Sequence, residues 1–154
     1  MLIEKLLSQL YKAQATVFKP VKIDDVRALR MQMAKNKMPA LPTDYVHFLS
    51  LTDGLMLNGL KLYGVSEHDR GDKAYVYPSL MSINEDCLKY ARRKDFVILG
   101  EKDEDYIVYN PKDKNYQIVD RMDLFVILTL PRFFDVMYLF TSELIGKEEL
   151  EKDK

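Results

Sequence analysis

Apolar residues recur every three or four positions in the first part of the chain, which is the spacing of an amphipathic helix. The pattern predicts a helix over residues 2–18, closed by Pro20, and a second helix over about 25–37 with Asp24 as its N-cap. The side chains expected to face the core are Leu2, Leu6, Leu10, Ala13 and Val17 in the first helix, and Val26, Leu29 and Met33 in the second.

The segment LPTDYVHFLSLTDGLMLNGLKLYG, residues 41–64, combines a helix signal with a hairpin signal. Pro42 suits the first turn of a helix, and Gly54 suits a left-handed cap at its C-terminal end. Asn58-Gly59 separates two short apolar runs and favours a type I′ turn, because both central residues of that turn need a positive φ. The helix is expected to turn Tyr45, Phe48, Leu49 and Thr52 inward.

Alternation of apolar and polar residues dominates the second half of the chain. The run FVILG is typical of a buried strand, and DYIVYN and NYQIVDR alternate on either side of a PKDK turn. Before them, KAYVYPSL favours a short strand ended by Pro78, and INEDCLKYARRK favours a helix capped by Asn84. A last helix is predicted over about 131–145, ended by Gly146, with Phe134, Met137, Tyr138 and Leu144 inward. Hairpin-length connections predict an α+β fold, with helices packed on one face of a largely antiparallel sheet.

The length of 154 residues predicts one domain over residues 1–146, with 1–24 as an N-terminal helix extension and 147–154 as a polar tail. The single cysteine, Cys87, excludes an intramolecular disulfide and a Cys-rich zinc site, and it favours a reducing compartment. No segment resembles a cleaved signal, so we expect a cytoplasmic protein.

Charge and hydropathy narrow the range of partners. The net charge is −1 and no region is strongly basic, so direct binding to nucleic acid is not expected. The most apolar window, LFVILTLPRFF, is interrupted by Pro131 and Arg132 and is too short to span a bilayer, so no membrane association is expected.

The residues that favour enzyme chemistry do not form a recognisable set. Gly54, Gly59 and Gly64 are spaced by five, but no Gly-Lys-Ser/Thr follows, so caps and turns explain them better than a phosphate loop. His47 and His68 have no acid, serine or cysteine at triad or metal spacing, which favours solvated histidines. We therefore expect no enzyme activity, no cofactor and no metal, although convergence of the two histidines with Cys87 on a pocket is left open.

Two charged loops are the candidate contact sites. EKDED, residues 101–105, is interpreted as a charged hairpin tip or a partner contact, with paired-carboxylate catalysis and calcium binding as alternatives. The calcium alternative lacks the glycine and the distant glutamate of an EF-hand loop. EHDRGD, residues 67–72, is interpreted as a surface loop or as a contact patch in which Arg70 grips a carboxylate. The predicted partner-binding residues are Asp69, Arg70, Asp72, Asp103, Glu104 and Asp105.

The order of these motifs resembles the SMI1/KNR4 superfamily, also called SUKH, and most closely its YrhA-like bacterial branch. The matching positions in residues 41–64 are Leu41, Pro42, Tyr45, Phe48, Leu49, Gly54, Leu62, Tyr63 and Gly64, and Asp53 stands where the family commonly has asparagine. FVILGEKDEDYIVYNPKDKNYQIVDR is similar to the family's apolar-Gly strand, acidic turn and hairpin, and RFFDVMYLF is similar to its C-terminal helix. The resemblance covers roughly residues 25–145.

The resemblance implies an α+β fold with a twisted, mainly antiparallel sheet and helices around it. It also implies a non-enzymatic binding role, because many bacterial members are associated with neutralising toxin domains, often nucleases or deaminases, of polymorphic toxin systems. Our first hypothesis is an immunity protein whose protein partner is such a toxin domain. The alternatives are a regulatory or scaffold protein linked to cell-wall assembly, as fungal relatives are, and a small ligand-binding protein.

Overall fold

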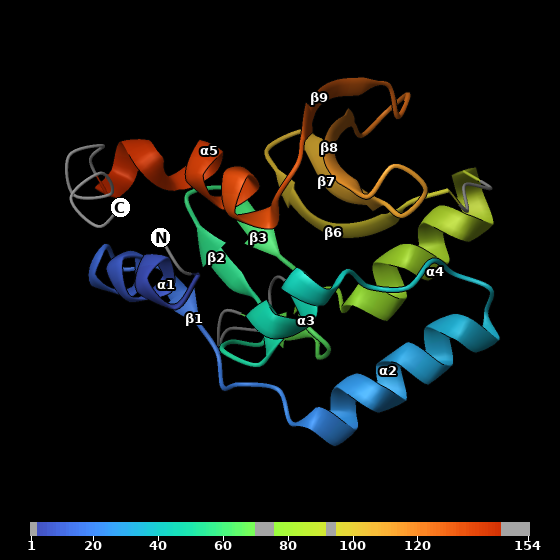
Figure 1. Ribbon diagram of the computed structural model, residues 1–154, viewed down its shortest axis with the longest axis horizontal. Coiled ribbons are helices and arrows are strands. Elements are labelled where there is room, and N and C mark those ends of the chain that lie inside the picture. The colour runs from blue at the N-terminus through green and yellow to red at the C-terminus, as the bar shows by residue number, and fades with distance from the viewer. Residues whose placement is uncertain (1–2, 70–75, 92–94, 146–154) are drawn as a thin grey trace.

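The computed structural model describes residues 3–69, 76–91 and 95–145. Its helices and strands are labelled in Figure 1. The helices are α1 (Ile3–Lys12), α2 (Ile23–Lys35), α3 (Thr43–Leu49), α4 (Leu80–Ala91) and α5 (Phe133–Ile145). The strands are β1 (Thr16–Val17), β2 (Leu55–Leu57), β3 (Leu60–Leu62), β4 (His68–Asp69), β5 (Val76–Tyr77), β6 (Val97–Lys102), β7 (Asp105–Asn110), β8 (Asn115–Asp120) and β9 (Val126–Leu130).

Seven strands form one sheet in the order β1-β2-β3-β6-β7-β8-β9, and β4 pairs with β5 in a separate ribbon. Every neighbouring pair is antiparallel. The sheet curls strongly between β6 and β9, as Figure 1 shows, and register shifts between Ile98 and Gly100 and between Ile118 and Val119 accompany the curl. The predicted α+β fold with an antiparallel sheet is confirmed.

An aromatic cluster joins α3 and α5 to one face of the sheet. The Phe133 ring at the start of α5 lies 5.3 Å from the Tyr45 ring and 5.4 Å from the Phe48 ring. On β8, the Tyr116 ring lies 5.9 Å from the same phenylalanine. All four side chains are buried, and large aromatic side chains dominate core energetics at such contacts. The segment from residue 41 therefore supplies core residues as predicted.

Helix α4 packs against β6 through Asn84, which is not the N-cap that the sequence predicted. The helix begins four residues earlier, at Leu80, so Asn84 lies inside it and is buried. Its amide nitrogen donates to the carbonyls of Leu80 and Ile98, at 2.8 and 2.9 Å, and its oxygen accepts from the Ile98 N–H at 2.7 Å. The side chain acts like a short piece of neighbouring strand, because it satisfies both main-chain groups of Ile98.

The predicted first helix is wrong in its second half. Helix α1 ends at Lys12, Gln14 has a φ of 69°, and the Ala15 N–H donates to the Leu10 carbonyl at 2.9 Å. A left-handed residue of this kind terminates a helix. The chain then turns to form β1, in which Val17 lies opposite Leu55 of β2. The apolar stripe continues past the helix because β1 also faces the core.

The N-terminal ends of α2 and α5 also differ from the prediction. Asp24 lies inside α2, since the N-cap is Lys22 and it makes no side-chain cap bond, but Val26, Leu29 and Met33 are buried as expected.

Helix α5 begins at Phe133, and Phe133, Val136 and Met137 are buried, whereas Phe134 and Tyr138 are half-buried. Gly146 and the polar tail 147–154 lie outside the described residues. None of the helices in the described part of the chain has both the length and the apolar composition needed to cross a bilayer.

The hairpin at Asn58-Gly59 is confirmed, because the two residues have φ angles of 46° and 85°. Gly54 also has a positive φ, 99°, but it does not cap a helix. Helix α3 ends at Leu49, with Pro42 as its N-cap and Ser50 as its C-cap. A Cβ atom on Gly54 would lie 2.6 Å from the Leu62 carbonyl oxygen, so this glycine permits the close approach of β2 and β3.

The hydroxyl of Tyr45 is buried and donates to the main-chain carbonyls of Tyr63 and Leu99, the latter at 2.9 Å. Burial, with a smaller contribution from Asp53, raises the pKa of Tyr45 well above 10.0. Burial and then the nearby Glu101 carboxylate raise the pKa of Tyr63 in the same direction. Both phenols therefore stay protonated in the folded protein at a pH where the unfolded chain ionises.

We expect the free energy of unfolding to fall as the pH rises above 10, because the unfolded chain loses protons that folded Tyr45 keeps. Each such phenol contributes a slope of about 1.4 kcal/mol per pH unit. In urea titrations between about pH 8 and pH 11, Tyr45→Phe should lower stability at pH 8 and flatten the slope. Tyr11→Phe, at a residue that is 67% exposed, is the control and should leave the slope unchanged. A Tyr45→Phe slope equal to that of the wild type contradicts this account.

Candidate protein-binding surface

A buried carboxylate, Glu101, lies on strand β6, in the middle of the strand order of the large sheet. It lies opposite Lys61 of β3 and Tyr106 of β7, so the three side chains share one face. The Tyr63 hydroxyl donates to Glu101 Oε1 at 2.9 Å, and Lys61 Nζ lies 3.6 Å from the same oxygen. Only 9% of the Glu101 side chain is exposed, and buried charges persist when they are paired and hydrogen-bonded in this way.

Arg121 connects Glu101 to both neighbouring turns. Its Nη2 group donates to Glu101 Oε2 and to the Asp103 carbonyl, the latter at 3.0 Å. Its main-chain N–H donates to the Glu104 carbonyl at 3.1 Å. The guanidinium also lies 5.2 Å from the centre of the Tyr106 ring. The turn between β6 and β7 is thus fastened to the turn between β8 and β9.

These two turns form what we call the acidic turn surface, which comprises residues 102–105 and 120–123. It carries five carboxylates and two basic side chains, so it has an excess of negative charge. Asp105 lies directly opposite Asp120 on the neighbouring strand. Like charges in such positions destabilise a sheet, so the placement of Asp105 opposite Asp120 opposes folding, although Asp120 has a structural role in its own turn. The turn 120–123 itself is well ordered, because Asp120 Oδ1 accepts the N–H groups of Met122 at 2.7 Å and Asp123 at 3.2 Å.

Met122 projects from the tip of this surface with 91% of its area exposed. An exposed apolar side chain inside a charged rim is the arrangement found at the centres of protein interfaces. The sequence analysis selected Asp103, Glu104 and Asp105, and the structure places them here. It did not select Asp120, Met122 or Asp123, which the hairpin register brings alongside.

The second predicted loop is described only as far as Asp69. Asp69 belongs to β4, which pairs with β5 in the separate ribbon. Arg70 and Asp72 lie outside the described residues. Their predicted role in partner binding therefore stays a prediction.

The two histidines and Cys87 occupy different parts of the fold. His47 Nε2 lies 2.7 Å from Glu4 Oε1 at the α1–α3 contact, where half of each side chain is exposed. A main-chain hydrogen bond and then this interaction with His47 lower the pKa of Glu4. His68 stacks on Phe18 with ring centroids 3.6 Å apart and lies 3.2 Å from an Asp53 carboxylate oxygen. Cys87 is half-buried on α4. Each histidine thus contacts an acid that is distant in the sequence, but neither contact includes a nucleophile. His68, with 18% of its side chain exposed, is not the solvated residue that the sequence predicted.

A hollow of about 490 Å³ between α2 and α3 is partly lined by His47. The Ser50 hydroxyl in this lining donates to the His47 carbonyl, not to its imidazole ring. A nucleophile and its base must share a hydrogen bond, so this pair does not form a catalytic set. The described residues also contain no group of three metal-ligating side chains.

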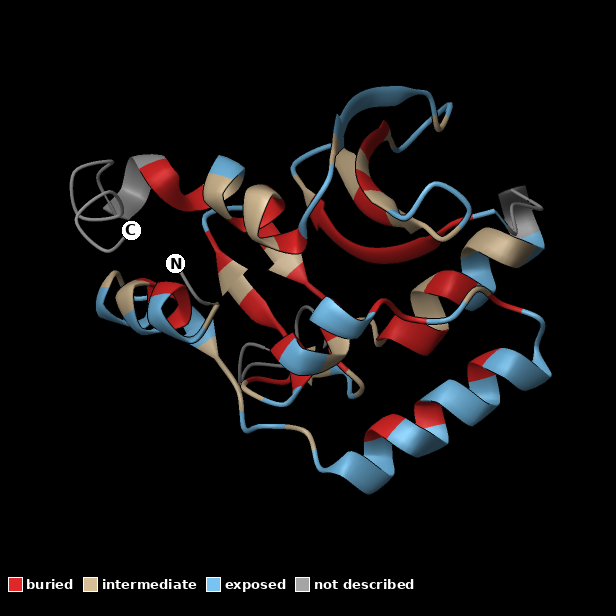
Figure 2. Cartoon of the chain, in the orientation of Figure 1, coloured by how far each residue is buried: buried red, intermediate tan, exposed pale blue. Residues whose placement is uncertain are grey.

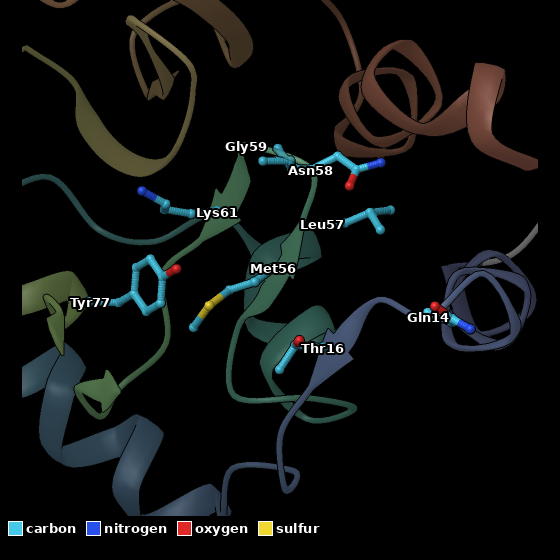
Figure 3. Close-up of a pocket in the computed structure, with 9 residues that line it drawn as sticks. Gln14, Thr16, Met56, Leu57, Asn58, Gly59, Lys61 and Tyr77 are labelled. Atoms are coloured by element: carbon cyan, nitrogen blue, oxygen red, sulfur yellow. The ribbon is translucent and has the colours of Figure 1, made fainter. Parts of the chain in front are cut away.

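A second hollow, of about 530 Å³, lies beside the β2–β3 hairpin. Figure 3 shows Met56, Lys61 and Tyr77 on one side of the hairpin, with Thr16 on the neighbouring strand. Lys61 Nζ lies 5.0 Å from the centre of the Tyr77 ring and also interacts with Glu101. The cation is thus engaged with groups of the protein itself, which favours a structural role for this lysine.

Comparison with known proteins adds no relative to this picture. No protein-family model matches the chain, and no curated protein sequence matches it either. The resemblance to the SMI1/KNR4 superfamily therefore rests on the motif residues given above.

Proposed function

We propose that this chain is a cytoplasmic, non-enzymatic binding module whose acidic turn surface contacts a basic protein. One observation carries the proposal: Arg121 fastens two acidic turns together around buried Glu101, with exposed Met122 at their tip. Because the turns are already ordered, little conformational entropy is lost when a partner binds. The excess of carboxylates attracts a basic partner and accelerates its encounter with the surface.

The specific role we propose is neutralisation of a toxin domain by covering its active site. This step rests on the resemblance to the SMI1/KNR4 superfamily. A nuclease domain suits the surface, because a protein that binds the phosphate backbone is basic at its active site. Blocking that site requires only affinity and shape, so the proposal needs no catalytic group in this chain.

The test is recovery of the partner from the organism's own cells, using tagged wild-type protein and a charge-reversed variant. Glu104→Lys with Asp105→Lys reverses two charges of the surface. The variant should fold, because the lysine introduced by Asp105→Lys would face Asp120 and replace a repulsive pair with an attractive one. The control, Glu85→Lys with Asp86→Lys, makes the same change of net charge at exposed positions on α4.

We expect the wild type and the α4 control to retain one toxin-domain protein in equal amount, and the turn variant to retain at most about a tenth of it. Equal retention by all three would contradict the proposed surface. Recovery of cell-envelope synthesis proteins alone would contradict the toxin role and support the regulatory alternative.

A further inference from the structure

Strand β9 is an open edge of the large sheet. It is last in the strand order and pairs with β8 alone among the described strands. Open edges present unpaired main-chain N–H and C=O groups, and proteins commonly protect them with charged side chains, proline or a covering element. The sequence from Phe125 to Leu130, FVILTL, contains neither charge nor proline, and Pro131 follows only after the strand ends.

Both faces of β9 carry exposed apolar side chains, and only Leu130 at its end is half-buried. Phe125 is 72% exposed, and the next three residues are 52%, 57% and 39% exposed. Figure 2 shows most of the strand pale blue, in contrast to the red and tan of β8 beside it. Successive residues of a strand point to opposite faces, so Val126, Ile127 and Leu128 place apolar surface on both sides. A contiguous exposed patch of this kind marks an interaction site.

Charged side chains flank both ends of β9. Asp120 and Asp123 precede the strand. Arg132 follows it, and its guanidinium is paired with Asp135 at 2.7 Å while 69% of its side chain remains exposed. The apolar strand thus has carboxylates before it and, after it, an exposed guanidinium that can be shared with a second carboxylate.

When two copies of β9 run antiparallel about a two-fold axis, the carboxylates before the strand in one copy lie near Arg132 of the other. Centring the pair on Ile127 places Asp123 opposite Pro131 of the second copy. Centring it on Leu128 places Asp123 opposite Phe133. In either register, each acidic turn lies beside Arg132 and the α5 N-terminus of the other copy.

We propose that two copies of this chain pair through β9 to form a dimer with one continuous sheet. The contact is isologous, because both copies use the same strand. Pairing leaves neither β9 edge open, so a third copy cannot join there. Residues 120–123 of the acidic turn surface would lie near the dimer contact, whereas the β6–β7 turn precedes a strand that is two positions from the edge, so Asp103, Glu104 and Asp105 are the part of the surface that the dimer leaves for another partner.

The test measures the mass of the purified full-length chain in solution over a range of concentrations, by sedimentation equilibrium. The wild type is expected to have twice the chain mass of 18.0 kDa. Ile127→Lys should weaken the dimer by about tenfold at low salt, because two like charges would lie across from each other near the axis and an apolar cross-strand contact would be lost. The control is Met31→Lys on α2, which makes the same kind of change at a residue that is 74% exposed and should leave the dimer intact.

A second variant tests the charge pattern without disturbing the turn. Asp123→Asn keeps an oxygen that can accept the Phe125 N–H, as Asp123 does at 2.9 Å, but it removes the charge. It should weaken the dimer by up to about fivefold at low salt and have less effect at high salt. Hydrogen exchange at the β9 amides should slow as concentration rises. A wild-type monomer at every concentration, or a dimer that Ile127→Lys leaves intact, would overturn the proposal.

Discussion

Replacing Arg121 with alanine should lower the free energy of unfolding by about 2–4 kcal/mol. The substitution removes the guanidinium that donates to Glu101 Oε2 and to the Asp103 carbonyl. Glu101 keeps its bonds with Tyr63 and Lys61, but one oxygen of a buried carboxylate loses its partner. The effect falls below that of a fully buried ion pair, because 39% of the Arg121 side chain is exposed. Urea denaturation followed by circular dichroism measures the change.

A double-mutant cycle separates the interaction between Arg121 and Glu101 from the other effects of removing the Arg121 side chain. Glu101→Gln in the Arg121→Ala background should recover part of the stability, because a neutral amide needs no counter-charge. Additive effects of the two substitutions would show that the pair does not act as we describe. The same Arg121→Ala variant should bind the basic partner more weakly, since the side-chain bond to the Asp103 carbonyl is lost and the two acidic turns are held only by main-chain contacts.

Replacing Gly64 with alanine should destabilise the fold by about 4 kcal/mol, or prevent folding altogether. A Cβ atom at this position would overlap the carboxylate and the carbonyl oxygen of Asp53. That carboxylate accepts the Val65 N–H at 2.5 Å and the Ser66 N–H at 3.3 Å, so it cannot move without losing these bonds. The pairs Asp53-Gly54 and Tyr63-Gly64 are thus packed directly against each other.

Gly59→Ala is the matched control for Gly64→Ala. Its φ is 85°, and a new Cβ would lie 2.7 Å from the exposed Asp103 side chain, which can rotate away. We expect a loss of only about 1–2 kcal/mol, mainly from backbone strain. Thermal unfolding of the two variants decides between them. A Gly64→Ala protein as stable as Gly59→Ala would contradict the packing described for Asp53.

Local signals in the sequence predicted the parts of the fold that local chemistry determines. Asn58-Gly59 predicted a type I′ turn because few other residues tolerate two positive φ angles in succession. β7 and β8 were predicted because their alternation matches the period of a strand, and β6 because a short continuous apolar run is typical of a buried strand. Asn84 was misplaced, since its bonds to Ile98 depend on how α4 packs against the sheet.

Strand β9 was missed for a physical reason. The run LFVILTL does not alternate, because both faces of the strand carry apolar side chains although most of them are exposed. A continuous apolar run normally indicates a buried strand, and the sequence analysis considered this one only as a membrane segment. Its exposure follows from its position at the edge of the sheet, and the spacing of apolar residues along the sequence does not indicate that position.

The sequence predicted one of the two turns that form the acidic turn surface. The motif EKDED drew attention to Asp103, Glu104 and Asp105, but Arg121 and Met122 lie in a separate segment of the sequence. The predicted turn at PKDK would have found them, because antiparallel pairing around it places Asp105 opposite Asp120. The bond from Arg121 to Glu101 spans two strands and follows only from the curled sheet.

The most direct test of the proposed binding surface is the association rate with the recovered partner at low salt. The account predicts that Glu104→Lys with Asp105→Lys slows association by about tenfold or more, while Glu85→Lys with Asp86→Lys has little effect. The difference between the two variants should shrink as salt is added. An association rate that is unchanged by reversal of the two turn charges would contradict the central claim.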